Sequence, residues 1–207
     1  MQTKLKEFFE STDDVTTYMD EVRSLMSAMV SEIDTEGVAR LTRAVEVARD
    51  NGRTIFTLGN GGSAVVASHF VNDMGVNSLV DGKKGYRVLS LADSVASITA
   101  VANDVEFDEV FVRQLRCNME PGDLCVGLSV SGNSENIVRA LAYANENGAR
   151  TFAISGFSGG RVAEVAQDRI HIPSSLDEYG PVEDAFSIIF HMVSSWLTMK
   201  QGRFLHH

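Results

Sequence analysis

From residue 54 onward, short apolar segments alternate with stretches of helical character, and this alternation restricts the chain to few folds. Five segments have the composition of β-strands: residues 54–58, 86–91, 124–129, 150–154 and 169–172. Their apolar residues run together without regular polar alternation, which is typical of strands buried on both faces. Buried strands joined by helices form a parallel sheet with helices on either side. The sequence therefore predicts a single doubly wound α/β domain with a five-stranded parallel sheet.

Helical periodicity fills the intervals between these strands and also precedes the first of them. The spacing of apolar residues predicts helices over residues 64–74, 94–102, 109–118, 135–147, 160–166 and 181–199. Two further helices, over residues 15–29 and 36–49, come before the first strand, and Asn51-Gly52 has the composition of a C-cap. We therefore expect an N-terminal helical hairpin over residues 1–52, followed by the α/β domain over residues 53–207.

The composition excludes several classes of function. The 207 residues include 28 Asp and Glu against 18 Lys and Arg, a net charge of −10, whereas nucleic-acid-binding surfaces are basic. No apolar run approaches the roughly 18 residues of a membrane span, and the first residues lack the apolar core of a signal peptide. Cys117 and Cys125 are the only cysteines, too few for a disulfide scaffold. We expect a cytoplasmic protein without nucleic-acid or membrane partners, and give His206 and His207 no role.

The first predicted strand ends in Gly59-Asn60-Gly61-Gly62-Ser63, and a helix is predicted to follow directly. Glycines let backbone N–H groups approach a ligand closely, and a helix N-terminus carries roughly half a positive charge. Ser63 adds a hydroxyl group. In parallel sheets, ligands bind beyond the carboxyl ends of the strands. This first turn, with Asn60, Gly61, Gly62 and Ser63, is therefore predicted to hold a phosphate group.

A second turn of similar composition follows the third predicted strand. Residues 129–136 contain Ser129, Ser131 and Ser134 beside a glycine and two asparagines. Serine and asparagine are also good helix caps, so one such turn alone leaves a purely structural role open. Two such turns together favour a phosphate monoester bound by hydroxyl and amide groups, since neither contains Lys or Arg. Neither has the spacing of a nucleotide-triphosphate loop or a dinucleotide-binding loop.

Together the two turns resemble those of the sugar isomerase (SIS) domain family, and within it the phosphoheptose isomerases. The resemblance extends over nearly the whole chain and includes Ala102-Asn103-Asp104, Phe111-Val112-Arg113-Gln114, Pro121-Gly122-Asp123 and residues 155–160. It implies a SIS, flavodoxin-like α/β fold and a bound sugar phosphate. By resemblance, the phosphate is held by Ser63, Ser129, Ser131 and Ser134. The resemblance also implies that Asn60 and Gly61 shape the pocket and that the substrate contacts Asp93, Ser94 and Ser97.

Four residues on two predicted helices are candidates for a metal site. His69 and Asp73 are four residues apart and share a helix face, as do Glu183 and His191, which are eight apart. From the residues alone, His69 is also explained as a buried structural histidine, and Glu183 as a first-turn carboxylate that stabilises its helix. The resemblance implies that these four positions bind zinc. Two histidine nitrogens and two carboxylate oxygens are suitable ligands for it.

This chain departs from the family at two of the four positions. The resemblance implies glutamate at position 73 and glutamine at position 183, and proton transfer by the residues at 73 and 191. Aspartate reaches about 1.5 Å less far than glutamate, and misplacement of a reacting group by about 1 Å can cost ~100-fold in rate. Asp73 and Glu183 therefore both stay open as the catalytic base, and so does binding of a phosphosugar without isomerisation.

The resemblance implies an aldose–ketose isomerase that converts a sugar phosphate, sedoheptulose 7-phosphate, through an enediol with zinc polarising the carbonyl. A different sugar phosphate is one alternative, and a non-catalytic SIS scaffold or regulator of the replication-initiator-binding type is another. The resemblance also implies a homotetramer in which the N-terminal hairpins pack together and subunits share active sites. Met19, Met26 and Met29 form an apolar stripe suited to that packing. The alternative is that this stripe packs on the chain's own sheet.

Overall fold

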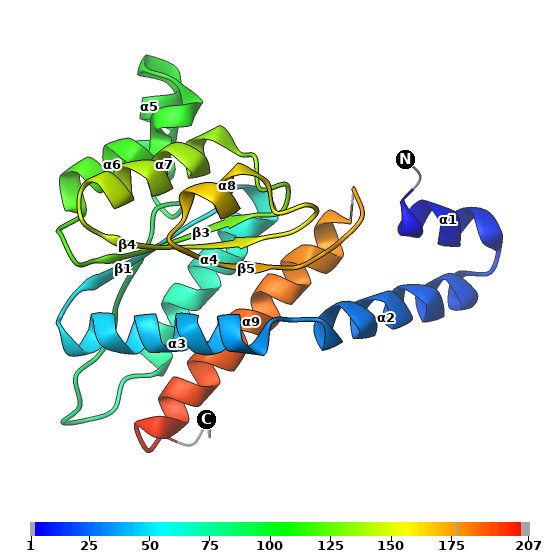
Figure 1. Ribbon diagram of the computed structural model, residues 1–207, viewed down its shortest axis with the longest axis horizontal. Coiled ribbons are helices and arrows are strands. Elements are labelled where there is room, and N and C mark those ends of the chain that lie inside the picture. The colour runs from blue at the N-terminus through cyan, green and yellow to red at the C-terminus, as the bar shows by residue number, and fades with distance from the viewer. Residues whose placement is uncertain (1–2, 177, 204–207) are drawn as a thin grey trace.

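The computed structural model describes residues 3–176 and 178–203, and His206 and His207 lie outside these ranges. It contains a five-stranded sheet (Figure 1). The strands are β1 (Thr54–Leu58), β2 (Arg87–Ser90), β3 (Leu124–Ser129), β4 (Arg150–Ser155) and β5 (Asp168–His171). All neighbours pair in parallel, in the order β2-β1-β3-β4-β5. The predicted α/β fold with five parallel strands is confirmed.

The strand order reverses at β1, and this reversal brings the two turns to one place. β2 pairs with one side of β1 and β3 pairs with the other. In parallel sheets, such a switch point opens a crevice at the carboxyl ends of the two strands that diverge. The turns that follow β1 and β3 are the two that the sequence predicts to bind phosphate. The topology therefore places both at the same edge of the sheet.

Helices cover both faces of the sheet. One face in Figure 1 carries α3 (Thr35–Asp50), α4 (Gly61–Val71) and α9 (Tyr179–Lys200). The other carries α6 (Val110–Asn118), α7 (Glu135–Glu146) and α8 (Gly160–Val165), with α5 (Val95–Asp104) and the short 3₁₀-helix η2 (Phe107–Glu109) beyond them. The predicted helices agree with these within a few residues at their ends, where helix boundaries are least sharply defined.

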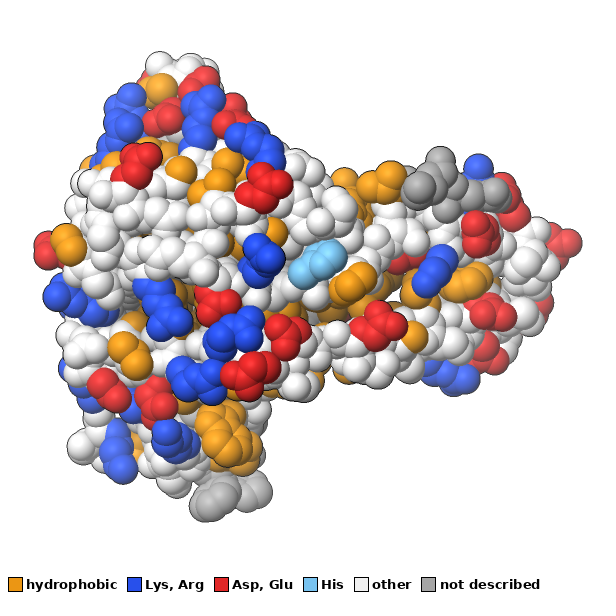
Figure 2. Space-filling model, in the orientation of Figure 1, with side chains coloured by type: hydrophobic (Ala, Val, Ile, Leu, Met, Phe, Trp, Pro, Cys, Tyr) orange, Lys and Arg blue, Asp and Glu red, His pale blue; other side chains and the backbone are white. Residues whose placement is uncertain are grey.

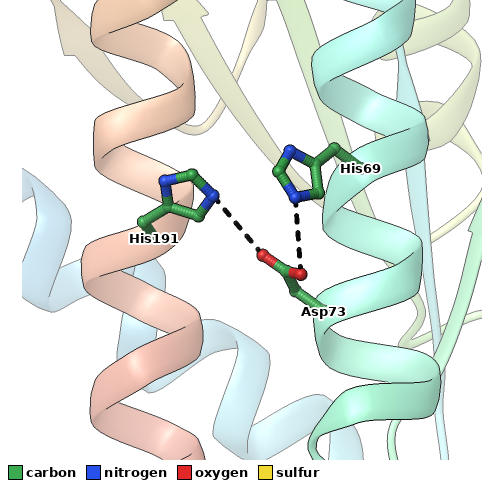
Figure 3. Close-up of side chains that lie close together, drawn as sticks. All are labelled: His69, Asp73 and His191. Carbon is green, nitrogen blue, oxygen red and sulfur yellow. Dashed lines mark ion pairs between the residues drawn. The ribbon is translucent and has the colours of Figure 1, made fainter. Parts of the chain in front are cut away.

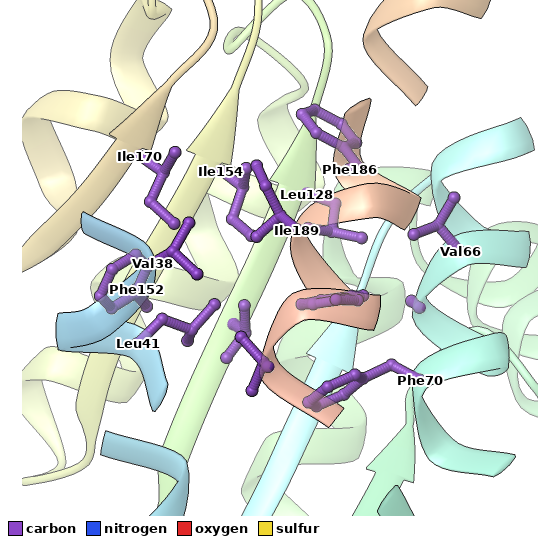
Figure 4. Close-up of a cluster of buried hydrophobic side chains, with 14 of the residues drawn as sticks. Val38, Leu41, Val66, Phe70, Leu128, Phe152, Ile154, Ile170, Phe186 and Ile189 are labelled. Carbon is purple, nitrogen blue, oxygen red and sulfur yellow. The ribbon is translucent and has the colours of Figure 1, made fainter. Parts of the chain in front are cut away.

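The core between the sheet and α3, α4 and α9 fixes the helices that carry the site (Figure 4). Phe70 of α4 stacks on Phe190 of α9, with ring centroids 4.1 Å apart. Phe186 of α9 is fully buried in the same cluster. Burying one such side chain contributes about 1.5–3 kcal/mol. Aromatic packing, rather than a loop, therefore holds α4 and α9 beside each other.

The N-terminal helices do not form the predicted hairpin. α2 (Val15–Ser31) and α3 follow one another across Figure 1, while α1 (Lys4–Ser11), which was not predicted, folds back against α2. The apolar face of α3 lies on the sheet, where Leu41 and Val45 are completely buried, so this face is not available to α2. α3 is thus part of the α/β core. α1 and α2 together are called the N-terminal arm below.

The two cysteines are unpaired, Cys117 at the surface and Cys125 in β3. Burial raises the pKa of the Cys125 thiol to about 12. Across residues 3–176 and 178–203, no helix has both the length and the apolar character required to cross a membrane.

Candidate active site

A pair of amide side chains joins the two turns at the switch point. Asn60 follows β1, and Asn136 lies in the first turn of α7. The Nδ2 group of each residue donates to the Oδ1 atom of the other, and both hydrogen bonds measure 2.9 Å. Asn136 is only 1% exposed, so the pair is largely shielded from water. Asn136 is not among the predicted site residues, because an asparagine near serines reads as an ordinary cap until the fold places it opposite Asn60.

The first turn leads into α4 and leaves its N-terminus without a side-chain cap. Gly61 has φ = 54°, in the left-handed region that favours glycine. A Cβ atom at Gly59 would lie 2.6 Å from the backbone of Ser63, so the tight bend also requires glycine there. Asn60 is the N-cap residue of α4, but its side chain is bound to Asn136 and makes no capping hydrogen bond. Uncapped N–H groups at the positive end of a helix are suited to an anion.

Serine hydroxyls hold the second turn in shape. The buried Oγ atom of Ser129 accepts a hydrogen bond from the Gly132 N–H at 3.1 Å and donates to Ser134 Oγ at 3.2 Å. Ser131 Oγ accepts from the Asn133 N–H at 3.2 Å. Ser131 and Ser134 are partly exposed at the sheet edge, whereas Ser129 is 3% exposed. Ser131 and Ser134 are therefore the accessible hydroxyls of this turn.

Two arginines lie next to the second turn, where the sequence predicts a site built from hydroxyl and amide groups. Arg161 and Arg139 both donate to the carboxylate of Glu135, the first residue of α7. The hydrogen bond from Arg161, followed by that from Arg139, lowers the pKa of the Glu135 carboxyl. The Arg161 backbone N–H also donates to Asn133 Oδ1 at 3.2 Å. The positive charge near this turn is thus partly balanced by Glu135.

Two histidines and an aspartate meet between α4 and α9 (Figure 3). His69 lies on α4, His191 on α9, and Asp73 on the helical segment η1 (Asn72–Asn77), which continues α4. The carboxylate of Asp73 lies between the two rings, with Oδ1 3.5 Å from His69 Nε2 and Oδ2 3.7 Å from His191 Nε2. The histidine side chains are 50% and 53% exposed, whereas that of Asp73 is 18% exposed. The cluster is therefore open to solvent on its histidine side.

The segment that carries Asp73 follows α4 directly, but it is a π-helix rather than a further α-helical turn. The sequence predicts one unbroken helix over residues 64–74, but α4 ends at Val71 and η1 runs over the next six residues. A π-helix has wider turns than an α-helix, so the direction of Asp73 differs from that in a regular helix. Such segments are frequent at functional sites, and nothing in the local residue pattern predicts this one.

The ligand atoms of this cluster suit a divalent metal ion. One atom each from His69, Asp73 and His191 can be chosen so that all three lie within 4.8 Å of one another. Two imidazole nitrogens and a carboxylate oxygen are ligands that zinc prefers, and a tetrahedral zinc ion takes four ligands. The residues present therefore fit the zinc ion that the family resemblance implies, and they come from a single chain.

Glu183, the fourth predicted ligand, lies elsewhere on α9. Its Oε1 atom accepts a hydrogen bond from Ser63 Oγ at 3.1 Å. Its Oε2 atom lies so close to Gly62 that a Cβ atom there would overlap with it. The structure thus brings Glu183 to the first turn, and not into the group formed by the two histidines and Asp73.

The predicted substrate residues after β2 divide into two groups. The carboxylate of Asp93 accepts a hydrogen bond from Ser68 Oγ, which places it against α4. Ser94 caps α5, because its Oγ atom accepts from the Ser97 N–H at 3.2 Å and lies 2.8 Å from Ser97 Oγ. Asp93 is therefore held against α4, whereas Ser94 and Ser97 satisfy each other at the start of α5.

The chain matches proteins of known family over most of its length. Residues 17–156 match the family described as SIS domain. A probable phosphoheptose isomerase from Thermoplasma volcanium is 35% identical over 163 residues, which are 79% of this chain and 82% of the relative. The phosphoheptose isomerase of Geotalea daltonii is 31% identical over 185 residues, which are 86% of this chain and 95% of that protein.

A solved structure agrees with these matches. The phosphoheptose isomerase of Neisseria gonorrhoeae has a TM-score of 0.77 to this chain at 25% identity, covering 89% of this chain and 96% of that one. The resemblance inferred from the two turns is therefore confirmed by relatives that align with this chain over most of both sequences. This chain belongs to the SIS domain family, and the relatives described above are named phosphoheptose isomerases or probable ones.

Proposed function

We propose that this protein is an aldose–ketose isomerase of a sugar phosphate, and that sedoheptulose 7-phosphate is its substrate. The observation that carries the proposal is the meeting of His69 and Asp73, on the helical stretch that follows the first turn, with His191 of α9. Relatives named phosphoheptose isomerase, at 31–35% identity, support the substrate. A different sugar phosphate is the alternative, since Asp73 and Glu183 depart from the pattern that the family resemblance implies.

The two turns are proposed to hold the phosphate end of the substrate. Donors would come from the uncapped N-terminus of α4 and from the hydroxyls of Ser63, Ser131 and Ser134. Ser129 would stabilise the second turn through its hydrogen bonds with Gly132 and Ser134. The Asn60–Asn136 pair fixes the distance between the turns. Fixing one end of a flexible sugar orients the other end for reaction, which is a large part of catalysis in such sites.

His69, Asp73 and His191 are proposed to hold zinc, with Glu183 as the further ligand. Bound zinc would act as a Lewis acid that polarises the substrate carbonyl. Asp73 is proposed as the base that takes the proton from the carbon beside the carbonyl, and His191 as the group that moves a proton on the other side, giving an enediol. Asp73 is preferred to Glu183 as the base because its carboxylate lies 3.7 Å from His191, whereas Glu183 is bound to Ser63.

The test combines metal content with turnover. Untagged protein loaded with zinc should bind it stoichiometrically, and His69→Ala should lose it. Conversion of sedoheptulose 7-phosphate, followed by NMR at saturating zinc, should fall by about 10²- to 10⁴-fold in Asp73→Asn, which removes the base and also a charged zinc ligand. Asp81→Asn, at an exposed aspartate of the loop after η1, is the control and should retain full activity. A metal-loaded protein that converts no five- to seven-carbon sugar phosphate would refute the proposal and favour a non-catalytic SIS scaffold.

We also propose that the N-terminal arm packs against other copies of the chain in a homotetramer that shares active sites. Phe9, Val15 and Met19 are 72%, 64% and 58% exposed, and hydrophobic side chains lie along the arm in Figure 2. Met29, by contrast, is 6% exposed and packs in the chain's own core, so only part of the predicted stripe is free. Light scattering should give four times the chain mass, and a monomer would refute this assembly.

A cytoplasmic location is proposed as well, and the two unpaired cysteines support it.

A further inference from the structure

The carboxylate of Glu183 occupies the position where a phosphate would meet the first turn. Its Oε1 atom accepts from the Ser63 hydroxyl at 3.1 Å. Its Oε2 atom lies against Gly62, in space that a Cβ atom at that residue would need. Gly62 and Ser63 belong to the first turn of α4, and the positive N-terminal end of this helix attracts an anion. Glu183 thus fills an anion position with an anion of the chain itself.

A phosphate and this carboxylate cannot use that position together. Both are negatively charged, and like charges in contact repel each other strongly where water is partly excluded. Both also need the same donor, since the hydroxyl of Ser63 has a single proton to give. Binding of phosphate at Ser63 therefore requires Glu183 to leave.

The cluster on the same pair of helices can receive the displaced carboxylate. Glu183 and His191 are eight residues apart on α9, about 12 Å along the helix axis. Side chains on a helix lean toward its N-terminus, so His191 leans toward the end of α9 that carries Glu183, whereas the Glu183 side chain has to turn toward the C-terminal end to meet it. His69, Asp73 and His191 provide three ligands, and zinc takes four.

We propose that Glu183 is a positioning residue that alternates between two places and thereby couples phosphate binding to metal binding. Without phosphate, the carboxylate is held by Ser63 in the space beside Gly62. Phosphate releases it to become the fourth ligand of zinc at His69, Asp73 and His191. This inference rests on the proposed function, from which it takes both the phosphate and the metal. Because binding equilibria are linked, phosphate strengthens zinc binding by the same factor as zinc strengthens phosphate binding.

The test uses the full-length protein, Zn²⁺ and glycerol 3-phosphate, a phosphate monoester that lacks a carbonyl group. The Zn²⁺ dissociation constant of the metal-free protein is measured by competition with a chelating indicator, with and without saturating glycerol 3-phosphate. We expect glycerol 3-phosphate to lower this constant by about 5- to 30-fold in the unaltered protein, within the usual range of coupling between two sites.

Glu183→Gln keeps the length of the side chain but removes the charge that competes with phosphate. We expect this variant to bind glycerol 3-phosphate about tenfold more tightly than the unaltered protein when both are metal-free, and to lose most of the coupling. Asp184→Asn is the matched control, since it removes one negative charge from the next, exposed residue of α9. It should retain the coupling of the unaltered protein.

Two results would overturn the inference. One is equal coupling in Glu183→Gln and in the unaltered protein, which would assign the effect to direct contact between zinc and phosphate. The other is equal affinity of the two metal-free proteins for glycerol 3-phosphate. Isomerase activity is measured separately on the same samples. Activity without coupling overturns only the role of Glu183, whereas a protein that neither binds glycerol 3-phosphate nor isomerises a sugar phosphate overturns the proposed function as well.

Discussion

Removing the amide of Asn136 should loosen the junction between the two turns, and the structure allows the cost to be worked out. Asn136→Ala removes two hydrogen bonds of 2.9 Å at a residue that is 1% exposed. Each neutral hydrogen bond contributes about 1 kcal/mol net, and leaving a buried partner unsatisfied adds to the loss. Asn60 is only partly buried and can turn to water, so we expect a total of about 2–3 kcal/mol. For a chain of this size, that is a drop of about 4–12 °C in Tm.

A double-mutant cycle with Asn60→Ala separates the amide pair from other effects of either substitution. Urea unfolding of the four proteins, at one protein concentration because the protein is proposed to be oligomeric, gives the free energy of unfolding of each. Both single variants lose the same two hydrogen bonds, so the double variant should lose about 1–2 kcal/mol less than the sum of the singles. Losses that add within about 0.3–0.5 kcal/mol would refute the reasoning, because additivity indicates independent sites.

Three other outcomes can be checked with simple assays. Gly62→Ala should weaken binding of glycerol 3-phosphate by about tenfold or more in isothermal titration, because its Cβ atom fills the space beside Ser63; an unchanged affinity would place the phosphate elsewhere. A thiol reagent should modify Cys117 rapidly in the native protein. Cys125 is buried and its pKa is raised to about 12, so it should react only after unfolding. Rapid modification of both cysteines in the native protein would contradict this. The pKa of Glu135 is lowered in the fold by hydrogen bonds from arginines, so its stabilising effect is present above its ordinary pKa of 4.5 and is lost as the pH falls through the lowered folded value. Urea melts from about pH 6 to about pH 3 should show less acid-induced loss for Glu135→Gln than for the unaltered protein, and equal losses would refute this.

The parts of the fold that can be predicted from sequence are those that depend on local composition. Thr54–Leu58 is a strand because its apolar and β-branched residues favour a buried, extended backbone, and the glycines after it favour a tight turn. That His69 and Asp73 lie on one side of a helical stretch is likewise local, since residues four apart share a helix face, but the π-helical turn that directs Asp73 is not. These predictions need no knowledge of the rest of the chain.

The parts that cannot be predicted depend on contacts between distant segments. Asn136 and Asn60 are 76 residues apart, and Ser63 and Glu183 are 120 apart, so no local pattern relates them. The missing hairpin has the same cause: the apolar face of α3 predicts a partner, but the sheet and α2 are both possible partners until the sheet is formed. The family resemblance supplies candidate residues for the site. It does not show that the side chain of Glu183, on α9, contacts the first turn.

The stack of Phe70 on Phe190 also determines when the site can open. His69 and His191 are each one residue away from these rings, so the backbone positions that carry the histidines can separate only if the packed core between α4 and α9 comes apart. Regions of that kind exchange their amide hydrogens through global unfolding rather than local fluctuation. The spacing of the two helices that carry the histidines should therefore exist before any metal arrives. An ion that binds it would raise the midpoint of unfolding in proportion to the logarithm of its concentration, without creating new structure.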